Sequence, residues 1–550
     1  MNTRTLQWLQ RSHSFLRYRG QRFTLMPIAM ALLLASLCTL LFLAPFMAQL
    51  QKHIPGQYSL QALLVLVLWL LNCGLFILLS VPGLPLLQRF LLSSLFLIAA
   101  ISHYFISHFG IVIDRAMLQN VLETDIAEAS GLLHAELILS TLGWLLLLGW
   151  LQRSIQFKTQ HWQQSAKQWL LGLLLVVAGL GVIASTHYAE LASFFRNYRA
   201  VKFYALPISP LVAGIAVTKQ QLAAHFPPTF QVLATDVRNQ QPAAAPRTLV
   251  LVLGETARAD HFQLNGYPRA TNPRLSKLPV VSFTQVSSCG TATAHSVPCM
   301  FSHLGRERYD ESIAKNSSNI LDILQSSGVD VSWYDHNSGC KGVCDRLPHQ
   351  MLFAQPPCQQ QDCTDAVLLQ ALQQVLATPA RKDRLIVLHQ LGSHGPEYFR
   401  RSLASQKVFA PECQQKELNN CQPQHIINAY DNSLLATDEL LANAIAQLQQ
   451  QPNSAMLYIS DHGESLGENG VYLHGLPYWM APKAQTNVPL IWWMSAEFAN
   501  NQQLSLGCLQ QQQAQPLSHD HLFHSLPALF GRASQLFRPE LNLFAGCTGR

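Results

Sequence analysis

The feature that this sequence has least of is charge. Only 12% of its 550 residues are Asp, Glu, Lys or Arg, whereas an ordinary soluble domain carries about 25%. Hydrophobic residues make up 49% of the chain, and intrinsic disorder requires the opposite balance of high charge and few apolar side chains. An entirely soluble chain and a disordered chain are therefore both excluded, and part of the protein is expected to lie in lipid.

Acidic residues are scarce in the first part of the chain. Residues 1–219 contain 15 Lys and Arg but 6 Asp and Glu, a net charge of +9, whereas residues 220–550 contain 22 and 25, a net charge of −3. The second part has no basic stripe, which a nucleic-acid-binding domain would need. The chain therefore divides into a basic membrane part and a weakly acidic part, and no nucleic-acid partner is expected.

Five apolar runs are long enough to cross a bilayer, which takes about 20 residues. The first is too long for a cleavable signal peptide and no small-residue cleavage site follows it, so it is expected to be retained. With the N-terminus inside, the inner segments carry nine Lys and Arg and the short outer loops carry two, a positive-inside bias. An odd number of spans then places the remainder outside. The runs are 23–50, 60–81, 90–113, 132–151 and 169–187.

Cysteine use agrees with that placement. Two cysteines, Cys38 and Cys73, lie in apolar runs, and the other ten follow residue 288. Close pairs outside the membrane suit local disulfides, each contributing about 2–3 kcal/mol for a loop of roughly ten residues. Structural zinc is the rival interpretation, but the spacings do not repeat as paired CxxC motifs. Cys508 and Cys547 belong to no close pair, and whether they bond each other stays open. The predicted disulfides are Cys289–Cys299, Cys340–Cys344, Cys358–Cys363 and Cys413–Cys421.

The predicted organisation has three parts: a transmembrane domain over 1–202, a bridge over 203–247 and an outer domain over 248–550. The bridge begins as an amphipathic stretch and ends in a proline-rich segment, which indicates an interfacial helix and a stiff linker. In the outer domain, runs that are apolar on both faces alternate with helical stretches, which predicts a mainly parallel sheet flanked by helices. The predicted strands are 248–253, 329–335, 384–389, 455–460 and 488–494.

Acidic and imidazole side chains follow three of these strands. Glu255 comes after the first, His389 and His394 after the third, and Asp461 and His462 after the fourth. The ligand site of an open α/β sheet lies beyond the carboxyl ends of its strands, so these residues are expected to converge. Mixed nitrogen and oxygen ligands suit a divalent metal, and zinc fits them best.

A reacting group is expected in the segment SSCGTATAHSVPC, residues 287–299. A rigid loop of small residues entering a helix can aim a hydroxyl and backbone N–H groups at an anion. No Lys or Glu stands beside it as a base, so a metal would have to activate the hydroxyl. Composition does not choose among Thr291, Thr293 and Ser296, and a disulfide-stapled surface turn remains the structural alternative.

Four segments carry a resemblance to a known family. They are GETARADHFQLNGYPRATNP (254–273), SCGTATAHSVPCMFS (288–302), HQLGSHGPEYF (389–399) and SDHGESLGENGVYLHG (460–475). Together with the five spans and the paired cysteines, they resemble the membrane-bound phosphoethanolamine transferases that modify lipid A or its neighbouring sugars. The resemblance implies an alkaline-phosphatase/sulfatase-like fold for the outer domain.

The same resemblance implies roles for individual residues. Thr293 matches the nucleophile and, with Glu255, Asp461 and His462, the zinc ligands. The positions that match a second metal site or the surroundings of the transferred phosphate are His394, His474 and Glu464. The positions that match substrate-binding residues are Asn337 and Lys341, and, in the loop between the third and fourth spans, Asn120, Thr124 and Glu128.

The implied protein is a zinc-dependent transferase of the bacterial inner membrane whose catalytic domain faces the periplasm. It would pass phosphoethanolamine from phosphatidylethanolamine to a lipid A phosphate through a phosphoethanolamine-threonine intermediate, acting as a monomer beside membrane lipid. The product carries less negative charge, which implies resistance to polymyxin and other cationic peptides.

Several alternatives remain open at this point. They are a core-sugar or other glycan acceptor, a phosphatase, sulfatase or phosphoglycerol transferase on the same fold, and a non-catalytic lipid sensor. The sensor would need a broken ligand set. A transporter is disfavoured because, apart from His103 and His108, the spans carry almost no ionisable residues.

Overall fold

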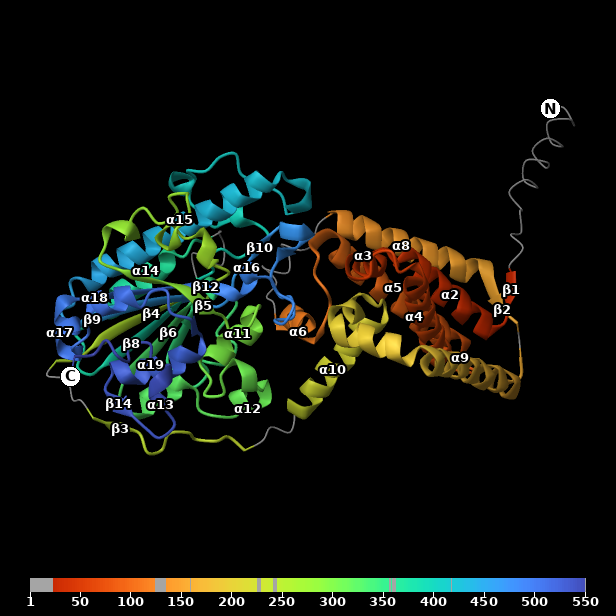
Figure 1. Cartoon of the computed structure of the whole chain (residues 1–550), viewed down its shortest axis with the longest axis horizontal. Coiled ribbons are helices and arrows are strands. Elements are labelled where there is room, and N and C mark those ends of the chain that lie inside the picture. The colour runs from red at the N-terminus through yellow and green to blue at the C-terminus, as the bar shows by residue number, and fades with distance from the viewer. Residues whose placement is uncertain are drawn as a thin grey trace, which may run out of the picture. The chain divides into compact units, whose positions relative to one another are not determined.

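The protein was analysed as a computed structural model, which describes residues 23–123, 135–158, 160–224, 229–240, 245–355, 358, 363–416 and 418–549. These residues form two compact units (Figure 1). The first unit comprises the described residues within Met1–Ile106 and Ala135–Val212, and the second those within Ser107–His134 and Ala213–Arg550. The loop that follows the third predicted span therefore groups with the outer domain, although it interrupts the membrane part in sequence.

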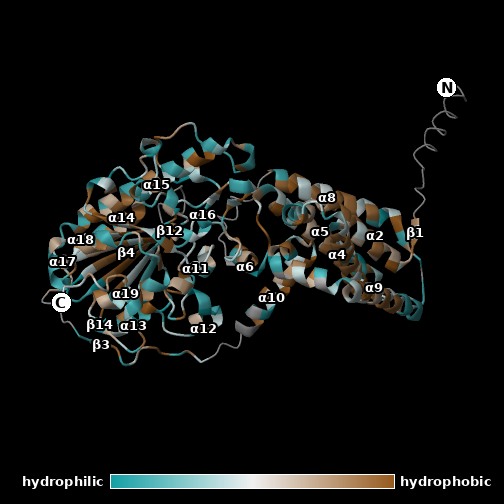
Figure 2. Ribbon diagram, viewed as in Figure 1, coloured by the Kyte–Doolittle hydropathy of each residue, from teal (hydrophilic) through white to brown (hydrophobic). Residues whose placement is uncertain are grey.

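The first unit is a bundle of apolar helices (Figure 2). In the part of the chain that the structure describes, four helices are long and apolar enough to cross a membrane, and a bent pair can supply a fifth span. The helices are α2 (Pro27–Leu41), α3 (Ala44–His53), α4 (Tyr58–Leu79), α5 (Pro85–Phe109), α8 (Ala135–Ser154) and α9 (Trp162–Asn197).

The first predicted span differs from the structure. The sequence predicts one continuous helix over 23–50, but α2 ends at Leu41, α3 begins at Ala44, and the two are bent by 53°. Pro45 near the start of α3 explains the break, because proline cannot donate the backbone hydrogen bond that would continue α2. The last span also extends beyond its prediction, since α9 reaches Asn197 across a kink at His187.

A buried polar contact fixes the bridge to the bundle. The Asn72 side chain on α4 is fully buried, and its Nδ2 atom donates to Thr39 Oγ1 at 2.9 Å and to the Leu206 carbonyl at 3.1 Å. Amide groups in an apolar interior are stable only when paired, so these bonds specify where the chain leaves α9. The bridging helix α10 then runs over Ile208–Ala224, within the predicted bridge.

The second unit is built on an eight-stranded sheet with the order β13-β5-β12-β9-β4-β8-β6-β7. The five predicted strands are present, and β12 is antiparallel to both its neighbours while the remaining pairs are parallel. The central strands β4, β8 and β9 are buried along their whole length, as their continuous apolar sequence requires. The strands are β4 (Thr248–Gly254), β5 (Val281–Ser287), β6 (Asp330–Asp335), β7 (His349–Met351), β8 (Arg384–His389), β9 (Ser454–Ser460), β12 (Asn487–Met494) and β13 (Leu517–Ser518).

Helices flank this sheet, as the alternating pattern predicts. The longest of them, α15, begins at Pro423, where proline suits the first helical turn. The helices of the second unit include α6 (Arg115–Glu123), α11 (Thr293–Met300), α13 (Ile320–Ser326), α14 (Ala366–Leu376), α15 (Pro423–Leu448) and α19 (Asp520–Leu529).

Five disulfides lie in the second unit. The four predicted pairs are formed, and Cys508 bonds Cys547, which settles the pairing that the sequence left open. Cys38 and Cys73 are free and buried in the first unit. The division of cysteine between lipid-embedded thiols and outer disulfides agrees with the topology predicted from charge.

Candidate active site

The ends of two neighbouring parallel strands bring the acidic residues together. β4 and β9 pair in register up to Gly254 opposite Ser460, so Glu255 and Asp461 leave the sheet side by side. The Asp461 N–H donates to the Gly254 carbonyl at 3.0 Å, which continues the ladder by one residue. The predicted convergence at the carboxyl edge of the sheet is therefore observed for these two residues and for His462.

Three side chains form a buried group of potential metal ligands. One atom each from Glu255, Asp461 and His462 lies within 4.8 Å of the others, and all three residues are fully buried. The hydroxyl of Thr293, the first residue of α11, donates to Glu255 Oε2 at 3.0 Å and lies 3.3 Å from His462 Nε2. The four residues that the family resemblance selects thus form one cluster.

Geometry distinguishes among the three candidate hydroxyls. Thr291 Oγ1 donates to the Leu476 carbonyl at 2.6 Å, and Ser296 Oγ donates to the Asp461 carbonyl at 2.5 Å. Both of these hydroxyls therefore bond to backbone carbonyls, whereas the Thr293 hydroxyl lies against the side chains of Glu255 and His462. Of the three hydroxyls, that of Thr293 is the one directed at the ligand group.

The ligand group fits a cation. Glu255 Oε1 and Asp461 Oδ2 are buried and, among the described residues, have no hydrogen-bond partner. Each lies 3.4 Å from His462 Nε2. Two buried carboxylate oxygens without donors are costly, and a divalent ion is the natural partner for them.

The pKa values of the ligand group also indicate that the site suits a cation. Burial, reinforced by the neighbouring Asp461, raises the pKa of Glu255, and burial raises the pKa of Asp461 to about 6. Burial and the neighbouring His474 lower the pKa of His462 to about 4. The imidazole is therefore neutral near pH 7, as a metal ligand must be.

Two more imidazoles and a carboxylate adjoin the cluster. The ring of His474 lies 4.4 Å from that of His462 and 5.2 Å from that of His394, measured between centroids. Glu464 Oε2 lies 3.4 Å from His474 Nδ1, and burial raises the pKa of Glu464 to about 8. All three residues lie beside the ligand group.

Asn337 contacts the ligand group directly. Its amide donates to Glu255 Oε2 at 2.7 Å and to the Gln390 carbonyl at 2.9 Å. His389 lies behind it, with Nδ1 2.8 Å from Asp335 Oδ2. His389 thus also lies at this edge of the sheet, with Nε2 3.3 Å from the Asn337 amide nitrogen, where its ring completes this buried chain of polar groups.

Lys341 lies in the loop that follows Asn337, at a φ of +52°. Its Nζ atom donates to the Ser338 carbonyl at 3.1 Å. The loop borders a pocket of about 420 Å³ lined by Lys315, Ser338, Lys341, Gly342, Asp345 and Arg346.

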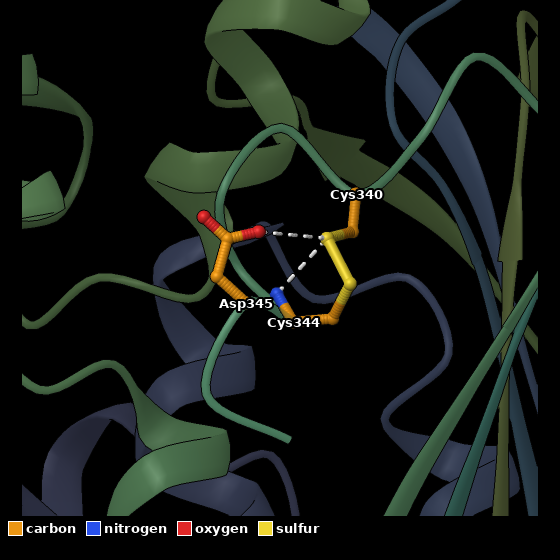
Figure 3. Close-up of side chains that lie close together, drawn as sticks. All are labelled: Cys340, Cys344 and Asp345. Carbon is orange, nitrogen blue, oxygen red and sulfur yellow. Dashed lines mark hydrogen bonds between the residues drawn. A yellow bond between two sulfur atoms is a disulfide. The ribbon is translucent and has the colours of Figure 1, made fainter. Parts of the chain in front are cut away.

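A second cluster of potential metal ligands proves to be structural. Cys340, Cys344 and Asp345 lie close together (Figure 3), but the two cysteines form a disulfide, so their sulfur atoms cannot ligate zinc as thiolates. The Cys344 N–H donates to Cys340 Sγ at 3.1 Å. The disulfide closes the loop that begins at Asn337, and here the disulfide interpretation holds over the zinc one.

The loop between the third and fourth predicted spans contributes α6. This helix packs against α11, the helix that begins with Thr293, and Asn120 is buried in it. Gln119 Nε2 donates to Glu311 Oε1 at 2.7 Å. Thr124 and Glu128 lie outside the described residues.

Three residues that shape the turn at Glu255 are not predicted from the sequence. Gly392 approaches so closely that a side chain there would meet the Glu255 carbonyl at 2.6 Å. A glycine shortly after a core strand is a usable signal for such an approach. Thr256 has a φ of +50°, and Tyr430 on α15 contacts it. No local pattern marks these two residues, because their contact spans 174 positions.

Comparisons with known proteins identify both parts of the chain. The model of the family described as sulfatase matches residues 247–532, and that of phosphoethanolamine transferase EptA/EptB matches residues 68–222. Phosphoethanolamine transferase EptA of Escherichia coli K12 is 38% identical over 483 residues, covering 84% of this chain and 86% of the relative.

Solved structures agree with these matches. The integral membrane lipooligosaccharide phosphoethanolamine transferase A of Neisseria meningitidis is 34% identical, with a TM-score of 0.89 over 95% of this chain and 99% of that one. The periplasmic domain of EptC from Escherichia coli, solved in complex with zinc, is 22% identical, with a TM-score of 0.50 over 59% of this chain and 92% of that one, and it supports the fold alone.

Together, these matches cover both the membrane helices and the outer domain. Like its relatives, the chain is an integral membrane protein whose catalytic domain lies in the periplasm. With a sulfatase-like domain joined to the transferase membrane domain, it belongs to the EptA family of phosphoethanolamine transferases.

Proposed function

We propose that this transferase moves phosphoethanolamine from phosphatidylethanolamine to a phosphate of lipid A, with Thr293 as the nucleophile. The observation that carries the proposal is the Thr293 hydroxyl, which lies 3.0 Å from Glu255 Oε2 beside two buried carboxylate oxygens that lack donors. The name of the matched Neisseria relative, a lipooligosaccharide transferase, favours an acceptor of the lipid A class for this chain too.

Glu255, Asp461 and His462 are the residues proposed to hold a zinc ion, with Thr293 as the fourth ligand. Their oxygen and nitrogen donors suit zinc, and the neutral His462 can ligate. When bound, zinc supplies positive charge that favours ionisation of a hydroxyl and offsets charge on a phosphoryl group. A free threonine hydroxyl is a weak nucleophile near neutral pH, so activation of this kind is required.

The transfer then proceeds through two displacements at phosphorus. In the first, Thr293 Oγ1 gives up its proton and bonds to the donor phosphorus while the bond to the glycerol oxygen breaks, and that oxygen takes up a proton as diacylglycerol leaves. In the second, a lipid A phosphate oxygen bonds to the phosphorus, the bond to Thr293 breaks, and Thr293 Oγ1 takes up a proton again. The two substrates would react alternately with the same threonine, which predicts ping-pong kinetics.

Further residues are proposed to serve these steps from the positions described above. His394 or His474, adjacent to the ligand group, would donate the proton to the leaving alcohol. Glu464, bonded to His474, would orient that ring or join a second metal site. Asn337 and Lys341 would hold the phosphoethanolamine group. Asn120 on α6 would contact lipid, and the family resemblance assigns the same role to Thr124 and Glu128, which lie outside the described residues.

The experiment is a mass analysis of lipid A from cells that express the full chain. The proposal predicts a phosphoethanolamine increment that Thr293→Ala abolishes, whereas Thr291→Val, which removes a hydroxyl bonded to backbone, reduces it without abolishing it. Modification of a core sugar with unmodified lipid A would reassign the acceptor. Equal modification by Thr293→Ala would overturn the assignment of the nucleophile.

A further inference from the structure

The backbone directly after Glu255 takes a conformation that its sequence disfavours. Thr256 has a φ of +50°, and among the described residues it is the only β-branched side chain at positive φ. Such residues are genuine outliers, because the branched Cβ crowds the following backbone. Strain of this kind persists only where the surroundings enforce it.

The strained turn orients the second carboxylate. The Thr256 N–H donates to Asp461 Oδ1 at 3.3 Å, and the His462 N–H donates to the same atom at 2.7 Å. Asp461 Oδ2 is left without a hydrogen-bond partner among the described residues. The turn therefore engages one oxygen of Asp461 and leaves the other oxygen for the ligand group.

The Thr256 side chain does not stabilise its own turn. It is fully buried, and its hydroxyl has no hydrogen-bond partner within the described part of the chain. The neighbouring Ala257 N–H donates to Ser460 Oγ at 2.9 Å, which anchors the exit from the turn but does not involve the Thr256 carbonyl.

Tyr430 provides the missing contacts from the opposite side. Its hydroxyl donates to the Thr256 carbonyl at 2.7 Å and accepts from the Arg258 N–H at 2.9 Å, so one oxygen bridges both ends of the turn. Tyr430 is fully buried in the middle of α15, and its ring packs edge-on against those of His261 and Tyr398. This packing fixes the position of the hydroxyl.

We propose that Tyr430 is a positioning residue for the metal site: its hydroxyl holds Thr256 in the left-handed turn that aligns Glu255 and Asp461. The inference rests on the proposed function of that site. Within the described part of the chain, the Tyr430 hydroxyl bonds the backbone of Thr256 and Arg258 and not the ligands or Thr293, so Tyr430 acts through the backbone. Residues that orient metal ligands from behind typically contribute about 10–100-fold to metal affinity or activity.

The test measures zinc affinity of the full chain in detergent by competition with a chromophoric chelator, together with kcat and KM for transfer. Tyr430→Phe keeps the ring and removes the two bonds. Thr256→Gly removes the strain, because glycine adopts positive φ freely. Tyr267→Phe is the matched control, since it removes a hydroxyl that donates to Asp431 Oδ2 at 3.0 Å and leaves Thr256 untouched.

The expected result is a loss of zinc affinity of about tenfold or more in Tyr430→Phe, a lower kcat with an unchanged KM, and wild-type zinc affinity in Tyr267→Phe. The double variant Thr256→Gly/Tyr430→Phe should regain most of the lost zinc affinity. If Tyr430→Phe alone fails to fold, the double variant is measured in its place.

Three results would overturn the inference. Wild-type zinc affinity in Tyr430→Phe would show that the hydroxyl does not support the site, provided that Glu255→Gln loses zinc. A double variant as weak as Tyr430→Phe would show that Tyr430 does not act through Thr256. Undiminished zinc binding by Glu255→Gln would overturn the proposed metal site, and this inference with it.

Discussion

Gly392→Ala is expected to disable the site while leaving the fold intact. Gly392 follows β8 at a φ of +52°, and a Cβ built there would lie 2.6 Å from the Glu255 carbonyl oxygen and 3.0 Å from its nitrogen. To reach ordinary contact at 3.4 Å, that carbonyl must retreat by about 0.8 Å. The carbonyl also accepts from the Ser393 N–H at 3.1 Å, so the two segments would be forced apart.

The size of the effect follows from that displacement. Misplacing a reacting group by about 1 Å can cost a factor of about 100 in rate, so kcat for transfer is expected to fall by about that factor. The alanine also bears the strain of positive φ, about 1–2 kcal/mol. Gly266→Ala separates the two effects, because Gly266 has a φ of +95° and a Cβ there would meet nothing within 4 Å.

The assay compares transfer rates, zinc affinity and thermal unfolding of the two variants in detergent. Both should unfold at a somewhat lower temperature than the unaltered chain, but only Gly392→Ala should lose activity and zinc affinity. Equal activity in the two variants would refute the argument that the Gly392 backbone sets the position of Glu255.

Three stability predictions can be checked by thermal unfolding of the full chain. The buried Arg247 guanidinium forms an ion pair with Asp383 at 2.7 Å. Arg247→Met should lower the free energy of unfolding by about 3 kcal/mol and the unfolding midpoint by roughly 6–12 °C. An unchanged midpoint would contradict this prediction. Replacing Cys508 and Cys547 with serine opens a loop with a sequence separation of 39 and should cost about 4 kcal/mol, so a midpoint shift of under 2 °C would refute that estimate. Burial raises the folded-state pKa of Asp438 from 3.8 to about 6, so its contribution to stability is full below pH 4 and is lost as pH rises through 6. Asp438→Asn should therefore flatten the change in midpoint between pH 4 and 6, and an identical slope in both proteins would count against it.

The parts of the fold that were predicted are those with strong local patterns. The core strands are continuous apolar runs, so the residues that leave their carboxyl ends, Glu255, Asp461 and His462, were predicted to meet. The strand β5, VSFTQVS, alternates polar and apolar residues and was missed. The break between α2 and α3 was missed because the run over 23–50 stays apolar across it, apart from a single proline.

The details of the site depended on contacts between distant residues. Local sequence left Thr291, Thr293 and Ser296 equivalent, and only the family resemblance and the geometry separate them, because the bonds of the other two hydroxyls reach residues 476 and 461. The contact of Tyr430 with Thr256 also has no local signature, since it joins the middle of a helix to a turn elsewhere in the chain.

The most direct test of the account is the covalent intermediate. The purified full chain would be incubated with phosphatidylethanolamine in the absence of any acceptor, and the peptide that contains Thr293 would be analysed by mass spectrometry. The account predicts one phosphoethanolamine group on Thr293 and its removal when lipid A is added. Transfer to lipid A with no modified threonine, or with the group on another residue, would contradict it.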